Sequence, residues 1–208
     1  MNTIALFSLA YLIGSIPTAY LAGKCCGIDI RQHGSGNVGA TNVFRVLGKR
    51  WGTFVLAIDI TKGFTVVFAM APQWHNAGSE LPTTILQLTA GLSAIAGHTW
   101  PIWLKFRGGK GVATSCGVFL AIYPKAVLLA LLVWIICARV SRYVSLSSLL
   151  AALVFPAALF FFYRLEPNFK VGLGISLALL CFIVYTHRAN IKRLLGGTEH
   201  KIGGNPRP

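Results

Sequence analysis

The chain has 208 residues, of which 55% are hydrophobic and only 12% are charged, against about 25% charged in an average soluble domain. This composition and a mean hydropathy of +0.66 exclude an ordinary soluble domain and predict a single membrane-embedded domain over residues 1–208. Nineteen Lys and Arg against five Asp and Glu give a net charge of +14. A nucleic-acid-binding protein would not also carry several apolar segments, so we expect no nucleic-acid partner. The cations instead indicate membrane topology and an anionic ligand.

Seven apolar segments approach the length of about 20 residues that a membrane-spanning helix needs. In chain order they cover residues 3–23, 53–72, 82–100, 112–123, 126–138, 144–163 and 171–187. The fourth and fifth segments are short, and they form either two short spanning helices or one re-entrant pair. The sequence predicts an all-α integral membrane protein with seven transmembrane helices, two of them short. Because no cation precedes the first segment, we expect an uncleaved first span rather than a signal peptide.

The positive charges predict the orientation of the chain. Four stretches between the apolar segments contain five, three, two and five Lys or Arg, which is fifteen of the nineteen. They are residues 24–51, 101–111, 138–143 and 187–208. The loops on the opposite side contain only Lys125, Arg164 and Lys170. Since cytoplasmic loops are enriched in Lys and Arg, we expect the N-terminus outside and the C-terminus in the cytoplasm. We expect residues 201–208 to form a flexible tail.

The first polar segment is rich in glycine. Residues Gly34–Gly39 satisfy the G-x-G-x-x-G pattern, with Asp59 further along the chain. A dinucleotide-binding unit would require a preceding strand, whereas an apolar span precedes this segment. Two interpretations remain: a loop that needs glycine turns, or an anion-binding nest of backbone N–H groups. In the second, preferred interpretation the polar ligands are Ser35, Asn37, Thr41 and Asn42.

The second polar segment, Phe106–Thr114, contains three glycines around Lys110. It differs from an ATP-binding P-loop, because Leu104 replaces the first glycine and Gly111 replaces the hydroxyl residue that binds magnesium. We therefore expect no ATP hydrolysis. Backbone N–H groups at the start of the 112–123 helix, next to a lysine, favour an anion site. The alternative is an ordinary basic loop beside the membrane.

The third polar segment follows the last apolar span. His187 ends that span, and Asn190 lies three residues on, so both share a helical face. A histidine found at a membrane interface by chance is the alternative interpretation. Ser145 and Ser148 follow Arg142 at another predicted cytoplasmic helix start, and their individual roles stay open.

Two further polar features lie within apolar segments. Asp59 and Lys62 are three residues apart in the second span, and mutual pairing is the favoured interpretation because intramembrane charges are costly. His98 is either a buried histidine with a hydrogen-bond partner or a catalytic one. The five cysteines show no metal-ligand spacing, so we expect reduced, structural cysteines, no metal and no cofactor.

The three polar segments, in this order, resemble the bacterial acyl-phosphate:glycerol-3-phosphate acyltransferase family (PlsY). The resemblance rests on Gly34–Asn42 with Arg45, on Lys105–Thr114 and on His187–Ile191. It extends over nearly the whole chain and includes Leu56–Gly63.

The resemblance implies a multi-pass enzyme of the bacterial cytoplasmic (inner) membrane with its active site at the cytoplasmic face. Such an enzyme transfers a fatty acyl group from acyl phosphate to the 1-hydroxyl of sn-glycerol 3-phosphate. The products are lysophosphatidic acid and phosphate, in the first step of phospholipid synthesis. Acyl-CoA is not used, and none of the histidines has an aspartate five residues later, as the acyl-CoA-type signature requires. Expected partners are the two substrates, membrane lipids and, weakly, other phospholipid-synthesis enzymes.

The resemblance also implies roles for individual residues. The acyl phosphate would be held by the loop that contains Gly108, Gly109, Lys110, Gly111 and Thr114. Glycerol 3-phosphate would be bound by Arg45, Ser35, His187 and Asn190. The expected catalytic residues are His187, Lys110 and Ser35, and the further substrate-binding residues are Asn37, Thr41, Asn42, Ser145 and Ser148. Either His187 or the phosphate of the substrate accepts the proton from the attacking hydroxyl.

Two other classes of function compete with this interpretation. A transporter or channel for an organic phosphate would use similar basic glycine loops, but it would show internal repeats and polar groups near the middle of the membrane. A non-catalytic membrane subunit would leave the paired anion sites unexplained.

Overall fold

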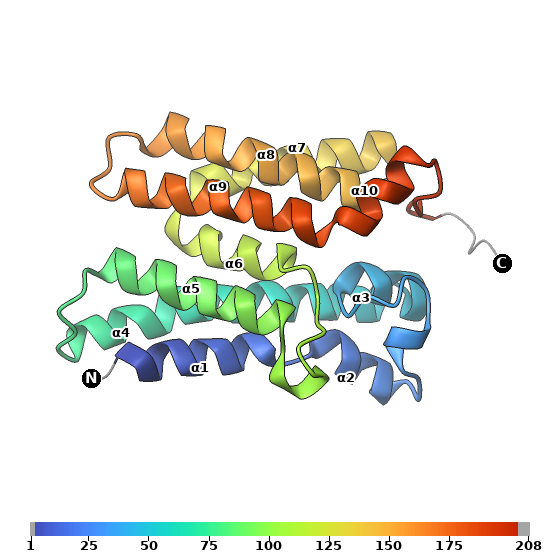
Figure 1. Cartoon of the computed structure of the whole chain (residues 1–208), viewed down its shortest axis with the longest axis horizontal. Helices are drawn as coiled ribbons and strands as arrows, with labels where there is room; N and C mark the ends of the chain where they lie inside the picture. The colour runs from blue at the N-terminus through green and yellow to red at the C-terminus, as the bar shows by residue number, and fades with distance from the viewer. Residues whose placement is uncertain (1–2, 204–208) are drawn as a thin grey trace. The chain divides into compact units, whose positions relative to one another are not determined.

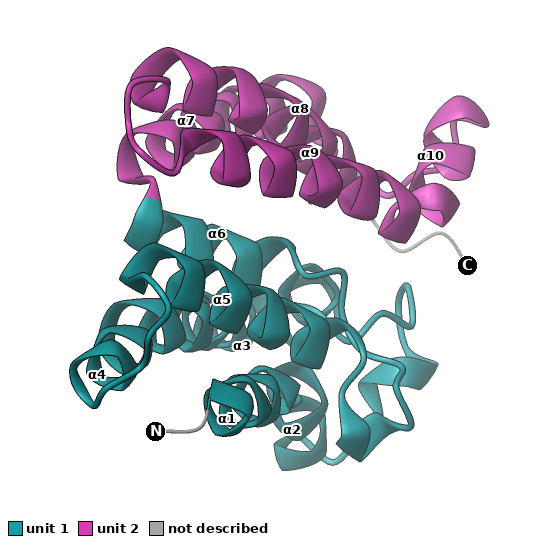
Figure 2. Ribbon diagram, turned by 60° about the vertical axis from the view of Figure 1, so that its left-hand side comes forward, with its two compact units in different colours: residues 1–122 teal, residues 123–208 magenta. Residues whose placement is uncertain are grey.

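The computed structural model describes residues 3–203, and these are helices and connecting loops without a β-strand. The chain divides into two compact units, residues 1–122 and residues 123–208 (Figures 1 and 2). The first unit contains α1 to α6, and the second contains α7 to α10. The all-helical fold class predicted from the apolar segments is confirmed for the described residues.

In the first unit a proline divides the first apolar segment. Helix α1 (Thr3–Ser15) ends before Ile16-Pro17, and α2 (Thr18–Cys25) starts directly after it. Proline lacks an N–H and its ring clashes with the preceding turn, so a helix cannot continue undisturbed through it. The break leaves the Ile16 carbonyl and the Thr18 hydroxyl available for bonds to other helices.

Helix α3 (Ala40–Thr65) is also interrupted. Gly48 has a φ of 83°, a left-handed value that glycine adopts at little cost, and it separates the first two turns from the rest of α3. A π-helical stretch, Val66–Met70, then joins α3 to α4 (Ala71–Asn76).

Two more helices complete the first unit. They are α5 (Thr83–Thr99) and α6 (Val112–Ile122), and α1 packs along α5 while α3 packs along α6. A core of small and branched apolar residues joins α1, α5 and the end of the long α3–α4 segment: Leu6, Ala10, Val66, Ala71, Leu86, Ala90 and Ala94.

The second unit contains three long helices and one short one: α7 (Pro124–Ser141), α8 (Val144–Tyr163), α9 (Phe169–Thr186) and α10 (Arg188–Leu195). Pro124 occupies the first turn of α7, where its missing N–H has no intrahelical role. Arg142 ends α7 in the left-handed conformation, with a φ of 63°. Helix α8 packs against both α7 and α9.

Each of the seven predicted apolar segments is mainly helical in the structure, and the first is divided at Pro17. Within residues 3–203 five helical stretches are long and apolar enough to cross a membrane: Thr3–Cys25, Ala40–Asn76, Pro124–Ser141, Val144–Tyr163 and Phe169–Thr186. Helix α6 is a shorter apolar helix of 11 residues, as expected. The prediction that 126–138 forms a second short helix was wrong, because α7 has 18 residues. It begins at Pro124 and continues past Arg139, so its ends do not coincide with the ends of the apolar run.

The close packing of α3 on α6 leads to a stability prediction. A methyl group on Gly117 would overlap the backbone carbonyl of Ile60. We expect Gly117→Ala to destabilise the protein by about 1–3 kcal/mol, as overpacking typically does. The matched control is Gly174→Ala in α9, where a methyl group meets nothing within 4 Å. Thermal unfolding in detergent should show a lower midpoint for Gly117→Ala only, and equal midpoints for both variants would contradict the packing.

Candidate functional site

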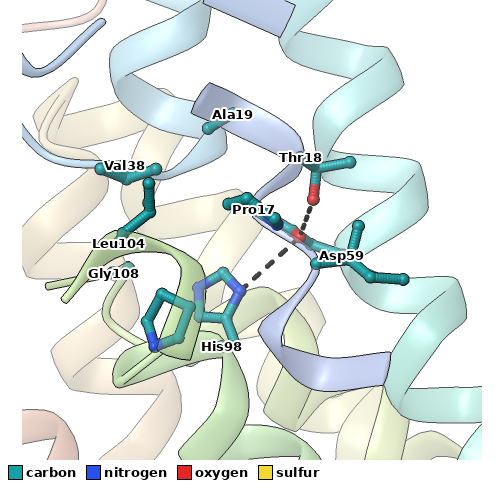
Figure 3. Close-up of a pocket in the computed structure, with 11 residues that line it drawn as sticks. Pro17, Thr18, Ala19, Val38, Asp59, His98, Leu104 and Gly108 are labelled. Atoms are coloured by element: carbon teal, nitrogen blue, oxygen red, sulfur yellow. Dashed lines mark hydrogen bonds and ion pairs between the residues drawn. The ribbon is translucent and has the colours of Figure 1, made fainter. Parts of the chain in front are cut away.

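A buried charged cluster lies in the first unit. Lys62 Nζ lies 2.8 Å from Asp59 Oδ1, so the predicted pairing is confirmed. Lys62 also lies 3.0 Å from Nδ1 of His98, and the Thr18 hydroxyl donates to Asp59 at 2.6 Å. Figure 3 shows the His98 ring on the side of Asp59 that faces Gly108. His98 is thus a buried histidine with a hydrogen-bond partner, one of the two alternatives that the sequence left open.

The break at Pro17 supplies two of the contacts in this cluster. One is the hydrogen bond from the Thr18 hydroxyl to Asp59. The other is made by the Ile16 carbonyl, which accepts a hydrogen bond from Lys62 Nζ at 3.2 Å. The spacing of Asp59 and Lys62 was visible in the sequence, but their contacts with Thr18 of α2 and His98 of α5 were not. The sequence indicated a larger cluster only through the polar residues within several apolar segments.

A narrow cavity adjoins this cluster. Its walls include Pro17, Asp59, His98, Gly108 and Gly109. The cavity thus lies between the charged cluster and the glycine loop.

The glycine loop after α5 is folded back onto His98. The Gly108 N–H donates to the Thr99 carbonyl at 3.0 Å, and the Gly109 N–H donates to the His98 carbonyl at 3.1 Å. A Cβ on Gly108 would overlap the His98 carbonyl, and a Cβ on Gly109 would overlap the His98 imidazole. These two glycines allow a close approach, and their N–H groups are engaged within the loop.

The N–H groups that suit an anion lie further along the same loop. Gly111 has a φ of 83° and turns the chain into α6 at Val112. The first N–H groups of a helix have no intrahelical partner and face the end of the helix where an anion is favoured. Lys110 is half-buried directly before this turn. Thr114 is fully buried, with its methyl group close to Gly63 of α3, so its side chain packs between helices.

The first glycine-rich segment is held by one asparagine. The Asn42 side chain accepts a hydrogen bond from the Ser35 N–H at 2.8 Å. Its amide nitrogen donates to the carbonyls of Ile30 and His33, at 3.2 and 3.0 Å. Asn42 is only 1% exposed, so it is a buried anchor of the loop.

The remaining predicted residues of this segment lie nearer the surface. Ser35 and Thr41 are exposed, and Asn37 and Arg45 are half-buried. Thr41 and Arg45 lie one turn apart on the part of α3 before Gly48, so they share a helix face.

Just upstream, Asp29 forms an ion pair with Arg31 at 2.6 Å. Hydrogen bonds from Arg31 outweigh the opposing effect of desolvation and lower the pKa of Asp29 to about 2. The Asp29 carboxylate therefore stays ionised and holds the short helical turn Ile30–Gln32 at its start.

In the second unit His187 lies at the junction of α9 and α10. Its Nδ1 lies 2.8 Å from the Ile183 carbonyl, and the residue is 3% exposed. A carbonyl only accepts, so Nδ1 donates a proton in this contact. Asn190 lies in the first turn of α10 and is also buried.

Several polar side chains of this unit bind one carboxylate, that of Glu199, which the sequence analysis did not identify as a candidate. Glu199 accepts hydrogen bonds from Ser145 at 3.0 Å, Asn190 at 2.7 Å and Arg193 at 2.7 Å. Burial raises the pKa of the Glu199 carboxyl, but these hydrogen bonds outweigh it and hold the pKa below its usual value of 4.5. Glu199 is therefore ionised at neutral pH.

The same contacts distinguish the candidate serines. Ser145 joins the Glu199 cluster, whereas Ser148 donates to the Val144 carbonyl and accepts a hydrogen bond from Trp134. The Arg142 side chain donates a hydrogen bond to the carbonyl of Ile202, a residue of the predicted tail, at 2.8 Å. Residues 204–208 of that tail lie outside the described residues. Among residues 3–203 no group of three His, Cys, Asp or Glu could hold a metal ion.

Comparison with known proteins gives one consistent result. The family model described as glycerol-3-phosphate acyltransferase matches residues 4–197. A glycerol-3-phosphate acyltransferase of Desulforamulus reducens is 46% identical over 98% of this chain and 96% of its own length. A second relative with this description, from Moorella thermoacetica, is 46% identical over 94% of this chain and 95% of its own.

Two solved structures are also similar to the chain. They are crystal structures of PlsY, an integral membrane glycerol 3-phosphate acyltransferase, in glycerol 3-phosphate and lysophosphatidic acid forms. The TM-scores are 0.83 and 0.81, and both are 39% identical over 97% of this chain. They cover 96% and 95% of the PlsY chain, respectively.

The Glu199 cluster leads to a pH-dependent prediction. A depressed pKa in the folded state means that the carboxylate contributes stability above its usual pKa and loses it as the pH falls. At pH 7 we expect Glu199→Gln to lower the thermal midpoint by about 2–4 °C, which corresponds to ~1 kcal/mol in a protein of this size. The difference should shrink as the pH falls below 4.5, the usual pKa.

The control for this measurement is Glu80→Gln. Within residues 3–203 the Glu80 side chain has no ion pair or hydrogen bond, so its midpoint should match that of the wild type. A Glu199→Gln midpoint equal to that of the wild type at pH 7 would contradict the stabilising role.

Proposed function

Because the chain belongs to the glycerol-3-phosphate acyltransferase family, we propose that it transfers a fatty acyl group from acyl phosphate to the 1-hydroxyl of sn-glycerol 3-phosphate. The products are lysophosphatidic acid and inorganic phosphate. The observation that carries the proposal is the family match over residues 4–197, because it includes all three polar segments. The relatives' names specify glycerol 3-phosphate as acceptor, and acyl phosphate as donor is the part that we add.

In the proposed reaction the 1-hydroxyl oxygen attacks the carbonyl carbon of the acyl phosphate. A carbon–oxygen bond forms, and the bond from that carbon to the phosphate oxygen breaks as phosphate leaves. The hydroxyl proton is transferred to the departing phosphate. Acyl phosphate is already an activated donor with a good leaving group, so this step needs neither a cofactor nor an enzyme-bound acyl intermediate.

The first unit supplies the groups for the acyl phosphate in this proposal. Lys110 and the first-turn N–H groups of α6 bind and neutralise the phosphate as charge develops on it. Preorganised donors of this kind typically contribute about 3–4 kcal/mol each. Gly108 and Gly109 shape the loop, since their own N–H groups bond to Thr99 and His98. Ser35 and Arg45 act on glycerol 3-phosphate.

In the second unit His187 and Asn190 bind glycerol 3-phosphate. The Nδ1 contact with Ile183 fixes the His187 ring. In the proposed reaction Nε2 accepts a hydrogen bond from the attacking hydroxyl and orients it, while the phosphate accepts the proton.

The location of the reaction follows from the charges. We propose seven spans, an outside N-terminus and an active site at the cytoplasmic face of the bacterial inner membrane. The fifteen Lys and Arg in the predicted cytoplasmic segments support this orientation.

The activity is tested by measuring phosphate release from palmitoyl phosphate by the purified protein, with and without glycerol 3-phosphate. We expect release that depends on glycerol 3-phosphate and an equal amount of lysophosphatidic acid. A Lys110→Met variant serves as the matched protein control and should lose most of the activity. If neither product forms, the acyltransferase proposal fails, and uptake of organic phosphate into vesicles is the next function to test.

The role of His187 is tested by His187→Ala, which removes both the hydrogen bond at Nε2 and any proton acceptor at this position. If the phosphate accepts the proton, the variant should raise the KM for glycerol 3-phosphate by roughly 10–100-fold, as for the loss of a strong hydrogen bond. The kcat should change little. A fall in kcat of roughly 10²–10⁴-fold with an unchanged KM would instead identify His187 as the general base.

A further inference from the structure

The proposed reaction does not use the buried cluster of Asp59, Lys62 and His98. Their exposed fractions are 1%, 6% and 9%. Charges inside a membrane protein are costly, and they occur where they pair or serve a function. The Asp59–Lys62 pair explains the two charges, but it does not explain why a histidine from α5 completes the cluster beside the glycine loop.

The contacts of the cluster fix the orientation of the His98 ring. Nδ1 lies 3.0 Å from Lys62 Nζ and 3.6 Å from Asp59 Oδ1. Nε2 lies at the opposite edge of the ring. This is the nitrogen that the Cβ of any other residue at position 109 would overlap. Lys62 thus holds one edge of the ring while the opposite edge faces Gly109.

The backbone next to His98 holds the same two glycines. Gly108 donates to the Thr99 carbonyl and Gly109 donates to the His98 carbonyl. The ring and the backbone of one short stretch of α5 therefore fix both residues. Only Lys110 and Gly111 separate them from the first turn of α6.

We propose that His98, held by Lys62 and Asp59, is a positioning residue that sets the place of the Gly108–Gly111 loop for the phosphate of the acyl donor. This inference rests on the proposed function. His98 does not touch substrate in this account, and it acts through Gly109.

A double-mutant cycle between His98 and Gly109 tests the inference. In His98→Asn the amide oxygen stands near the position of Nδ1, so the bond to Lys62 is kept while the ring edge against Gly109 is lost. We expect each of His98→Asn and Gly109→Ala to raise the KM for palmitoyl phosphate by roughly 10-fold or more. The double variant should have at least about fivefold higher kcat/KM than the product of the single effects, because the shorter side chain makes room for the methyl group.

Two results would overturn the inference. Single effects that multiply in the double variant would show that His98 does not act through Gly109. A wild-type KM for palmitoyl phosphate in folded His98→Asn would show that the cluster only stabilises the fold. The control is Thr89→Val on the same helix, whose hydroxyl bonds only to α5 carbonyls, and it should keep the wild-type KM.

If His98→Asn does not fold, Thr18→Val replaces it. This nearly isosteric change removes the 2.6 Å hydrogen bond to Asp59 and leaves every charge in place. We expect a rise of severalfold in the KM for palmitoyl phosphate, and an unchanged KM contradicts the inference.

Hydrogen exchange of the loop provides a readout that does not need activity. The amides of Gly108 and Gly109 should exchange faster in the His98→Asn or Thr18→Val variant than in the wild type and Thr89→Val. If the wild type is active but the two variants exchange these amides at the wild-type rate, the positioning role is refuted and the proposed function is not. A wild type that forms no lysophosphatidic acid refutes the proposed function, whatever the exchange shows.

Discussion

The buried ion pair between Asp59 and Lys62 is the interaction on which the first unit depends. Removing two charges from water costs several kcal/mol per ion, and only good geometry and further hydrogen bonds offset this cost. Those bonds come from the helix break at Pro17, through Thr18 and Ile16, and from His98 at the end of α5. Losing one charged partner of such a pair typically costs about 3–5 kcal/mol. The break in the first span, the long α3 and the glycine loop after α5 therefore require one another.

A carboxylate also orders the polar groups of the second unit. Glu199 joins Ser145 of α8 to Asn190 and Arg193 of α10, and its hydrogen bonds keep it ionised. The chain has only five acidic residues. Three of them form ion pairs with Lys or Arg: Asp29, Asp59 and Glu199. Each of these three acidic residues therefore fixes a basic side chain in the fold.

The sequence predicted the helices well because long apolar runs in this chain have few alternatives to helix. It predicted their ends less well: α7 continues through Arg139, α3 begins at Ala40 before the apolar run starts, and Pro17 interrupts a run in which hydropathy alone shows no end. The i,i+3 pairing of Asp59 with Lys62 was readable, since helical spacing brings such residues together. The contacts of Lys62 with His98 and of Ser145 with Glu199 join residues 36 and 54 positions apart, and no local spacing encodes them. For the same reason Gly108 and Gly109 suggested anion binding, whereas their need for close contact with His98 appears only in the fold.

The choice of acyl donor is the most direct test of the central claim. Purified protein would be incubated with glycerol 3-phosphate and either palmitoyl phosphate or palmitoyl-CoA, at equal donor concentrations. The lysophosphatidic acid formed would be measured by mass spectrometry. The account predicts product from palmitoyl phosphate alone, with one phosphate released for each acyl group transferred. Product from palmitoyl-CoA and none from palmitoyl phosphate would contradict it.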